Sequence, residues 1–197
     1  MCGRYFFDLD SEELRELYKK IQEQARREEK LAEKIASGEV YPSNYVITIG
    51  GNKENKPVAA VTKWGFTGFK KGQLMINARS ESVEEKRTFA KPFQENRCVF
   101  PMSGFYEWDQ DKKKFLFTEG KVMYVAGFYR IHHSSEGIET ESIIMTTEPN
   151  QSVSKIHDRM PLIIEKKDIG SWIADIDFAR ECINAAEMPA LKRTLVS

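Results

Sequence analysis

The segment from Cys98 to Thr147 constrains the fold most strongly, because strand-like runs and turn signals alternate along it. Aromatic and β-branched residues fill the runs, and polar or glycine-containing stretches interrupt them. We expect strands at Cys98–Pro101 running into Phe105–Trp108, then at Phe115–Thr118, Val122–Ile131 and Ser142–Thr147. Turns are expected at Asp109–Lys113, Glu119–Gly120 and His132–Glu141. The middle of the chain is therefore predicted to be rich in β-strand.

The N-terminal part predicts a strand, a helix and a hairpin. Met1–Phe7 is typical of a short strand, and Asp10 followed by Glu13 resembles a capping box that opens a helix. Apolar residues then recur near a 3.6-residue period as far as Ile35, so we expect one long amphipathic helix that Gly38 ends. A hairpin is predicted from the strands Tyr45–Ile49 and Val58–Phe66.

Shorter elements are predicted further along the chain. Ser82 with Glu85 is typical of the start of a short helix, which we expect to end before Pro92. Leu162–Ile164 is predicted to be a buried strand. Residues 168–186 are predicted to form one or two short helices, and residues 192–197 a small basic tail.

Composition limits the class of protein. The 197 residues, of which 41% are hydrophobic, predict one domain spanning residues 1–197. Thirty basic residues balance thirty acidic ones, so a local cluster must bind any anion. The chain shows no leader and no long apolar run, so we expect a cytosolic protein with no membrane partner. The cysteines are odd in number and widely spaced, and no CxxC or HExxH pattern occurs, so we expect no metal and no cofactor.

The first four residues, Met-Cys-Gly-Arg, offer an unusual nucleophile. A small second residue permits removal of Met1, and Cys2 would then carry a free α-amino group beside its thiol. The reference pKa values are about 7.7–8.0 for the amine and about 8.5 for the thiol, so both have reactive fractions near neutrality. A 1,2-aminothiol condenses with an aldehyde to a Schiff base, which the thiol closes into a thiazolidine. A disordered terminus is the alternative interpretation.

Two further segments offer proton-transfer groups. Strand alternation would place Glu107 on the face opposite Tyr106 and Trp108, where apolar surroundings would raise its pKa. A surface ion pair is the alternative. An extended stretch before Pro161 would place His157 and Arg159 on one side, although a lone histidine is more often structural.

Four stretches together resemble the SOS response-associated peptidase family, across residues 1 to about 165. They are Met1–Arg4, Ile76–Glu81, Gly104–Trp108 and Ile156–Pro161, with Trp64–Phe66 as a weaker match. The resemblance implies a single α+β domain with a mainly antiparallel, barrel-like sheet flanked by helices. It also implies a covalent thiazolidine link between mature Cys2 and an abasic site, preferentially in single-stranded DNA, by a monomer that removes its own Met1.

The resemblance also implies roles for individual residues. Cys2 is the nucleophile, Asn77 orients the new amino terminus, Glu107 is the acid and base of imine formation, and His157 moves protons at the sugar. Phosphates are expected to bind the arginines Arg4, Arg79 and Arg159. Further DNA contacts are expected from Ser80, Trp64 and Phe69.

The chain departs from the family pattern in two places. The loop of residues 67–72 lacks the proline and tryptophan that form a wedge in the family, so Phe69 is the expected substitute. Residues 188–197 contain no histidine, whereas the family has a His-Pro-Val-type segment there.

Two rival functions share some of these residues. One is an N-terminal-nucleophile peptidase that acts on other proteins, with the Cys2 amine as base for its own thiol. The other is a non-covalent single-stranded-DNA binder whose binding is indifferent to Cys2.

Overall fold

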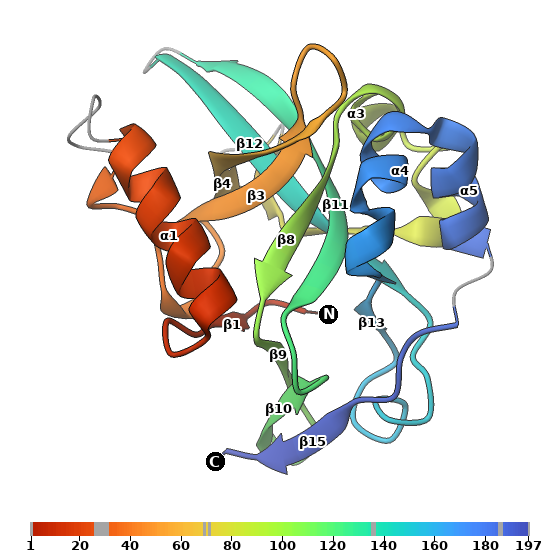
Figure 1. The fold of residues 1–197 in the computed structure, drawn as a ribbon. Helices are drawn as coiled ribbons and strands as arrows, with labels where there is room; N and C mark the ends of the chain where they lie inside the picture. Colours follow the sequence, from red (N-terminus) through yellow and green to blue (C-terminus); the bar gives the residue numbers. More distant parts are fainter. Residues whose placement is uncertain are drawn as a thin grey trace.

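Five strands close into a barrel in the computed structural model, which describes residues 2–25, 32–68, 70, 72–134, 137–184 and 187–196 (Figure 1). Around the barrel the order is β12, β4, β3, β8, β11 and back to β12. All neighbours are antiparallel except β12 and β4. The bounds are β3 Tyr45–Gly51, β4 Pro57–Trp64, β8 Arg97–Met102, β11 Met123–Ser134 and β12 Gly137–Thr147. The expected α+β fold with a barrel-like sheet is confirmed.

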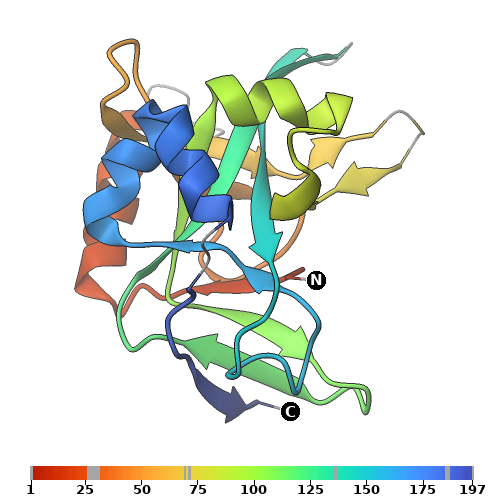
Figure 2. The same ribbon diagram turned by 90° about the vertical axis from the view of Figure 1, so that its right-hand side faces the viewer.

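A second sheet lies below the barrel in Figure 2, with the order β15-β10-β9-β1-β2. Its strands are β1 Tyr5–Phe7, β2 Gly38–Val40, β9 Gly104–Trp108, β10 Lys114–Thr118 and β15 Lys192–Leu195. The expected basic tail therefore contains a strand, β15, which pairs with β10 from Phe115↔Leu195 to Thr118↔Lys192. Phe105 and Phe117 stack in this sheet with their ring centroids 5.2 Å apart.

Five further strands are short, and three of them pair with strands of the barrel. β7 pairs in parallel with β12, whereas β13 and β14 pair antiparallel with β12 and β11. β5 and β6 form a small separate hairpin. The bounds are β5 Phe66–Thr67, β6 Leu74–Met75, β7 Asn77–Arg79, β13 Met160–Pro161 and β14 Ile163–Ile164.

The expected turn at residues 132–141 is wrong for the described part of this stretch, because β11 extends to Ser134 and β12 begins at Gly137. His132 pairs with Glu139 and His133 with Ile138. Ile138 is 72% exposed, so this end of the hairpin faces water. Polar side chains are compatible with a strand where the sheet is solvated, and for that reason they do not mark a turn.

The first helix, α1, spans Glu12–Ala25, one residue later than the expected start. Residues 26–31 of the predicted long helix lie outside the described residues. Ile35 is not helical, because it forms a parallel bridge to Tyr45 and its side chain is buried. Gly38, with φ of +71°, begins β2 and does not end a helix, so this part of the expectation is wrong.

Helices α3, α4 and α5 cover the barrel on the side opposite α1 (Figure 1), and two 3-10 helices, η2 and η3, are short. Their bounds are η2 Ser80–Ser82, α3 Arg87–Glu95, η3 Lys166–Asp168, α4 Ile169–Ala174 and α5 Ile176–Asn184. The short C-terminal helices are confirmed. Pro92 lies inside α3, contrary to the expected stop, and burial of Phe89, Pro92 and Phe93 compensates for the missing backbone donor. No helix of the described residues is long and apolar enough to cross a membrane.

Two apolar clusters form the core. One lies between the lower sheet and the barrel and includes Cys2, Tyr5 and Trp64. The other lies between the barrel and α3–α5 and includes Phe128 and Trp172. The cysteines described are free: Cys98 is buried as expected, whereas Cys182 is only partly buried.

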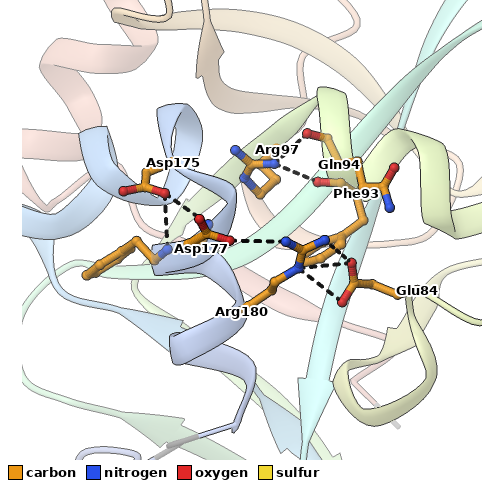
Figure 3. A network of polar contacts seen from close by, with 8 residues as sticks. Glu84, Phe93, Gln94, Arg97, Asp175, Asp177 and Arg180 are labelled. Carbon is orange, nitrogen blue, oxygen red and sulfur yellow. Dashed lines mark hydrogen bonds and ion pairs between the residues drawn. The ribbon is translucent and has the colours of Figure 1, made fainter.

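Arg97, in β8, forms hydrogen bonds with α3 and α4, and Figure 3 shows its bonds to Phe93 and Gln94. Its guanidinium is buried and donates to the carbonyls of Phe93 and Gln94 at the end of α3, at 2.9 and 2.7 Å. It also donates to the carbonyls of Trp172 and Ile173 in α4, at 2.6 and 2.9 Å. The last carbonyls of a helix have no intrahelical donor, so one side chain satisfies two helix ends.

Replacement of Arg97 by Met is expected to lower the free energy of unfolding by at least about 3 kcal/mol, because each carbonyl left buried without a donor costs about 1–3 kcal/mol. Arg180 is the matched control in the same network. It pairs with Glu84 at 2.9 Å, and its side chain is 42% exposed. Arg180→Gln should therefore cost less than about 1 kcal/mol. Urea denaturation of both variants measures the difference, and equal losses would contradict this assignment.

Candidate functional site

Cys2 lies between the barrel and the lower sheet, just before β1, and its side chain is fully buried. Asn77, the first residue of β7, donates from Nδ2 to the Cys2 carbonyl at 2.9 Å. The thiol donates to the Arg4 carbonyl at a sulfur to oxygen distance of 3.8 Å. The pairing of β7 with β12 therefore brings Asn77 to a residue 75 positions earlier in the chain.

Glu107 and His157 come together from two other segments. Glu107 is the fourth residue of β9 and is 2% exposed. His157 lies in the loop that precedes β13, and its Nε2 is 3.9 Å from Glu107 Oε2. Four segments distant in sequence therefore place a cysteine, an amide, a carboxyl and an imidazole at one junction of barrel and sheet.

Burial tunes the protonation of this site. It raises the pKa of Glu107 to about 7, and it lowers the pKa of His157 below its usual range. Burial first, and then the charge of Glu107, raise the pKa of the Cys2 thiol. Near neutral pH the site therefore holds a thiol, a neutral imidazole and a carboxyl that can either give or take a proton.

The His157 ring has two hydrogen-bonding arrangements available. Its Nδ1 accepts from the Arg159 backbone N–H at 3.0 Å and lies 2.9 Å from Asp158 Oδ1. A neutral ring that accepts from the amide carries its proton on Nε2, toward Glu107, whereas a ring that donates to Asp158 leaves Nε2 as an acceptor. His157 can thus give or take a proton at Nε2.

Arg159 is occupied by partners within the protein, and its expected role as a phosphate ligand stays a prediction. Arg159 is 6% exposed, and its guanidinium donates two 2.8 Å hydrogen bonds to the Glu81 carboxylate and a third of 2.7 Å to the Thr146 carbonyl. Glu81 follows β7, and Arg159 follows His157. The ion pair therefore fixes the His157 loop against the segment that carries Asn77.

This arrangement predicts different effects for Arg159→Ala and Arg79→Ala. Arg79 is exposed and has no ion pair with any described residue. If it contacts a phosphate, Arg79→Ala flattens the salt dependence of single-strand binding by about 0.7 in log–log slope. Arg159→Ala should leave that slope unchanged while lowering stability by about 1–3 kcal/mol, because it removes the donor of the buried Thr146 carbonyl. Anisotropy titrations over a salt series and urea denaturation measure both effects. An equal loss of slope in both variants would restore Arg159 as a phosphate ligand.

Arg4 lies outside the buried junction, on the lower sheet. Its Nη1 donates to Glu39 Oε1 at 2.9 Å, and its guanidinium lies 4.2 Å from the centroid of the Tyr41 ring. The sequence did not predict this partner, because Glu39 is brought beside Arg4 only by the register of β1 and β2.

Two of the other residues expected to contact DNA are buried, and their expected role stays a prediction. Trp64 is fully buried, with its indole nitrogen donating to the Ile76 carbonyl at 3.1 Å. Ser80 is 3% exposed, and its hydroxyl contacts Glu81 at 3.3 Å. Apolar packing and β-propensity favoured a strand at Trp64, but could not show which face was covered. Phe69 lies outside the described residues.

The part of the chain that the structure describes contains no cluster of three or more His, Cys, Asp or Glu side chains able to hold a metal ion. A cavity of about 480 Å³ borders His157 and is lined by Asp109, Asp111 and Asp158 among others.

The fold and the site define a barrel protein whose chemical groups gather around a cysteine at the N-terminus. The SOS response associated peptidase (SRAP) family profile matches residues 1–196, and the chain belongs to this family. It is 33% identical over 187 residues to the Abasic site processing protein YoqW of Bacillus subtilis, which covers 88% of this chain and 80% of that protein. It is 28% identical over 148 residues to the Abasic site processing protein YedK of Escherichia coli, covering 72% of this chain and 66% of that protein.

Solved structures support the fold. A crystal structure of a Bordetella bronchiseptica protein matches with a TM-score of 0.75 at 18% identity, and the match covers 100% of both chains. A Bacteroides thetaiotaomicron protein matches with a TM-score of 0.68 at 19% identity, over 81% of this chain and 78% of that one. At these identities the similarity concerns the fold alone.

Proposed function

We propose that this chain processes abasic sites in DNA by linking mature Cys2 covalently to the ring-opened sugar, preferentially in single strands, after it removes its own Met1. Its relatives are named abasic site processing proteins, and we take the type of DNA lesion from these names. Two pairs near Cys2 carry the chemistry. Asn77 Nδ2 donates to the Cys2 carbonyl at 2.9 Å, and Glu107, which contacts His157, is near enough for its charge to raise the pKa of the Cys2 thiol. The overall class, abasic site processing, follows from the family; the thiazolidine and the strand preference are our proposal.

Removal of Met1 comes first, because the nitrogen of Cys2 is an unreactive amide until the Met1–Cys2 peptide bond is hydrolysed. Water supplies the hydroxyl of the released methionine and a hydrogen of the new amine. Asn77 already holds the Cys2 carbonyl, so it would keep the new amino terminus in place after the cleavage.

The sugar must then open. An abasic sugar is mostly a closed hemiacetal, so one group takes the proton of its hydroxyl and another protonates the ring oxygen. The Nε2 of His157, which can exchange its proton, suits this step. The product is a free aldehyde at the position where the amine attacks.

Condensation and ring closure complete the link. The amine adds to the aldehyde carbon and water leaves, giving an imine. The Cys2 sulfur then adds to the imine carbon, and the nitrogen gains a proton as the thiol loses one. Because burial raises the pKa of the thiol, a base must assist, and Glu107 with a pKa of about 7 is suitably poised. The net reaction consumes one aldehyde and one aminothiol and releases one water.

A direct test mixes the purified protein with a single-stranded oligonucleotide that contains one abasic site, followed by a denaturing gel without any reductant. The expected result is a slowly migrating band that survives denaturation. The matched controls are the same oligonucleotide without the lesion and the abasic oligonucleotide in a duplex. A protein that binds the single strand but forms no such band would instead fit the non-covalent binder.

A further inference from the structure

Two cations, one just before β1 and one in β10, converge on one carboxylate oxygen on the lower sheet. Arg4 Nη1 and Lys114 Nζ lie 2.9 and 2.6 Å from the same atom, Glu39 Oε1. The side chains of Arg4 and Glu39 are both 29% exposed and that of Lys114 is 13% exposed, so the cluster is half-buried. One carboxylate thus holds two cations, and the triad keeps a single net positive charge.

Aromatic rings surround these cations. The Arg4 guanidinium lies 4.2 Å from the Tyr41 ring centroid and 5.1 Å from that of Trp108. Lys114 Nζ lies 4.1 Å from the Tyr106 ring centroid. Tyr41 is 43% exposed. Cations interleaved with aromatic rings are the pattern with which proteins bind single-stranded nucleic acid, since phosphates meet the cations and bases stack on the rings.

Strand register places the triad on one face of the lower sheet. Glu39 pairs with Phe6, which also pairs with Gly104, and Lys114 pairs with Trp108. Directly paired residues share a face, so Glu39, Lys114 and Trp108 lie on the same side. Glu107, one residue before Trp108, lies on the opposite face. Arg4 is two residues after Cys2, and its carbonyl accepts from the Cys2 thiol, so the backbone of Arg4 adjoins the proposed reacting group.

The charge of Glu39 allows it to compete with a phosphate for the two cations. Partial burial alone would raise the pKa of Glu39, but hydrogen bonds from Lys114 and Arg4 lower it below its ordinary value. Glu39 is therefore ionised near neutral pH. The whole chain has a formal net charge of zero, so no long-range positive field attracts DNA. Arg4 and Lys114 are therefore the local cations for a phosphate, and Glu39 competes for them.

We infer that Glu39 occupies the position of a DNA backbone phosphate, and that Lys114 joins Arg4 as a phosphate ligand when a strand displaces the Glu39 carboxylate. This inference rests on the proposed function and adds two residues to it. The Arg4 and Lys114 donors that now meet at one carboxylate oxygen suit a phosphate oxygen equally well. Glu39 would then hold both cations ready and weaken binding of undamaged strands.

The test measures binding of a fluorescent, undamaged oligothymidylate by anisotropy over a salt series. Glu39→Gln keeps the side-chain shape and removes the charge, so we expect several-fold tighter binding at low salt. The log–log salt slope should steepen by about 0.7 for each additional phosphate that the protein neutralises. Adding Lys114→Met to Glu39→Gln should reverse this steepening by one phosphate, whereas Lys114→Met alone should change the slope less. Glu39→Thr, which suits the edge strand β2, gives a second neutral variant should Glu39→Gln fold poorly.

Glu139→Gln is the matched control. Glu139 accepts from Lys63 at 2.9 Å, with side-chain exposures of 27% and 30%, but it lies in the barrel on β12. It loses the same charge and should leave the slope unchanged. An unchanged or flatter slope in the Glu39 variants, or an equal effect of Glu139→Gln, overturns the inference. If wild type still forms the abasic-site adduct, the proposed function stands. A wild type that forms no adduct and binds no strand overturns the proposed function as well.

Discussion

Replacement of Cys2 by Ala is expected to abolish the denaturation-resistant adduct with an abasic single strand. Alanine retains an α-amino group once Met1 is removed, so it can form only an imine, which water reverses. Gel analysis without reductant measures this loss directly. Because Cys2 is buried beside the core cluster, its removal leaves a small cavity, and a thermal melt of the variant checks that it is folded.

Cys2→Ser separates the rival chemistries. The hydroxyl closes the ring poorly because it is a weaker nucleophile than a thiolate, so this variant should give an adduct only when borohydride traps the imine. A non-covalent binder would bind the strand equally with Cys, Ser or Ala at this position. If Cys2→Ala forms as much adduct as wild type without reductant, the thiazolidine mechanism is wrong.

Replacement of Glu107 by Gln is expected to slow crosslinking about 10²-fold to 10⁴-fold over the neutral range, since the amide keeps the shape and cannot exchange a proton. The measurement is single-turnover crosslinking with mature protein in excess. Each sample needs an intact mass beforehand, because a variant that retains Met1 has no amine to react. Comparison is valid only between samples that have lost Met1.

The pH dependence follows from the pKa of Glu107. Burial raises that pKa to about 7, so the carboxylate that accepts the thiol proton is largely absent at pH 5 and predominant at pH 8. The wild-type rate should therefore rise with pH through an inflection near 7. Glu107→Gln should lose this inflection and retain only the rise due to the amine, whose reference pKa is about 7.7–8.0. A Glu107→Gln variant that reacts at the wild-type rate would remove Glu107 from the mechanism.

The sequence predicted most of the strands because their signals are local. Aromatic and β-branched runs marked β8–β11, and alternation placed Glu107 opposite Trp108. The errors arose where tertiary contacts decide. Residues 132–134 and 137–141 lie in the two strands of a hairpin whose end is solvated, Ile35 pairs with Tyr45 and is not helical, and Pro92 lies inside α3 because that face is buried.

The sequence named candidate site residues, but it could not predict most of their contacts. Cys2, Asn77, Glu107 and His157 were named from short motifs, and the fold brings Asn77 to Cys2 and His157 to Glu107. Which arginine is free could not be read from the sequence. Arg159 pairs with Glu81 from a segment 78 residues away, and Glu39 reaches Arg4 and Lys114 through strand register alone.

The mass of the intact adduct tests the central claim most directly. Purified protein is reacted with an abasic single strand of known mass, and the product is weighed without reductant and then digested to locate the link. The account predicts the mass of the chain lacking Met1 plus the oligonucleotide minus one water, with the DNA on the N-terminal peptide that begins at Cys2. An adduct that retains Met1, or one attached at a lysine, would contradict it.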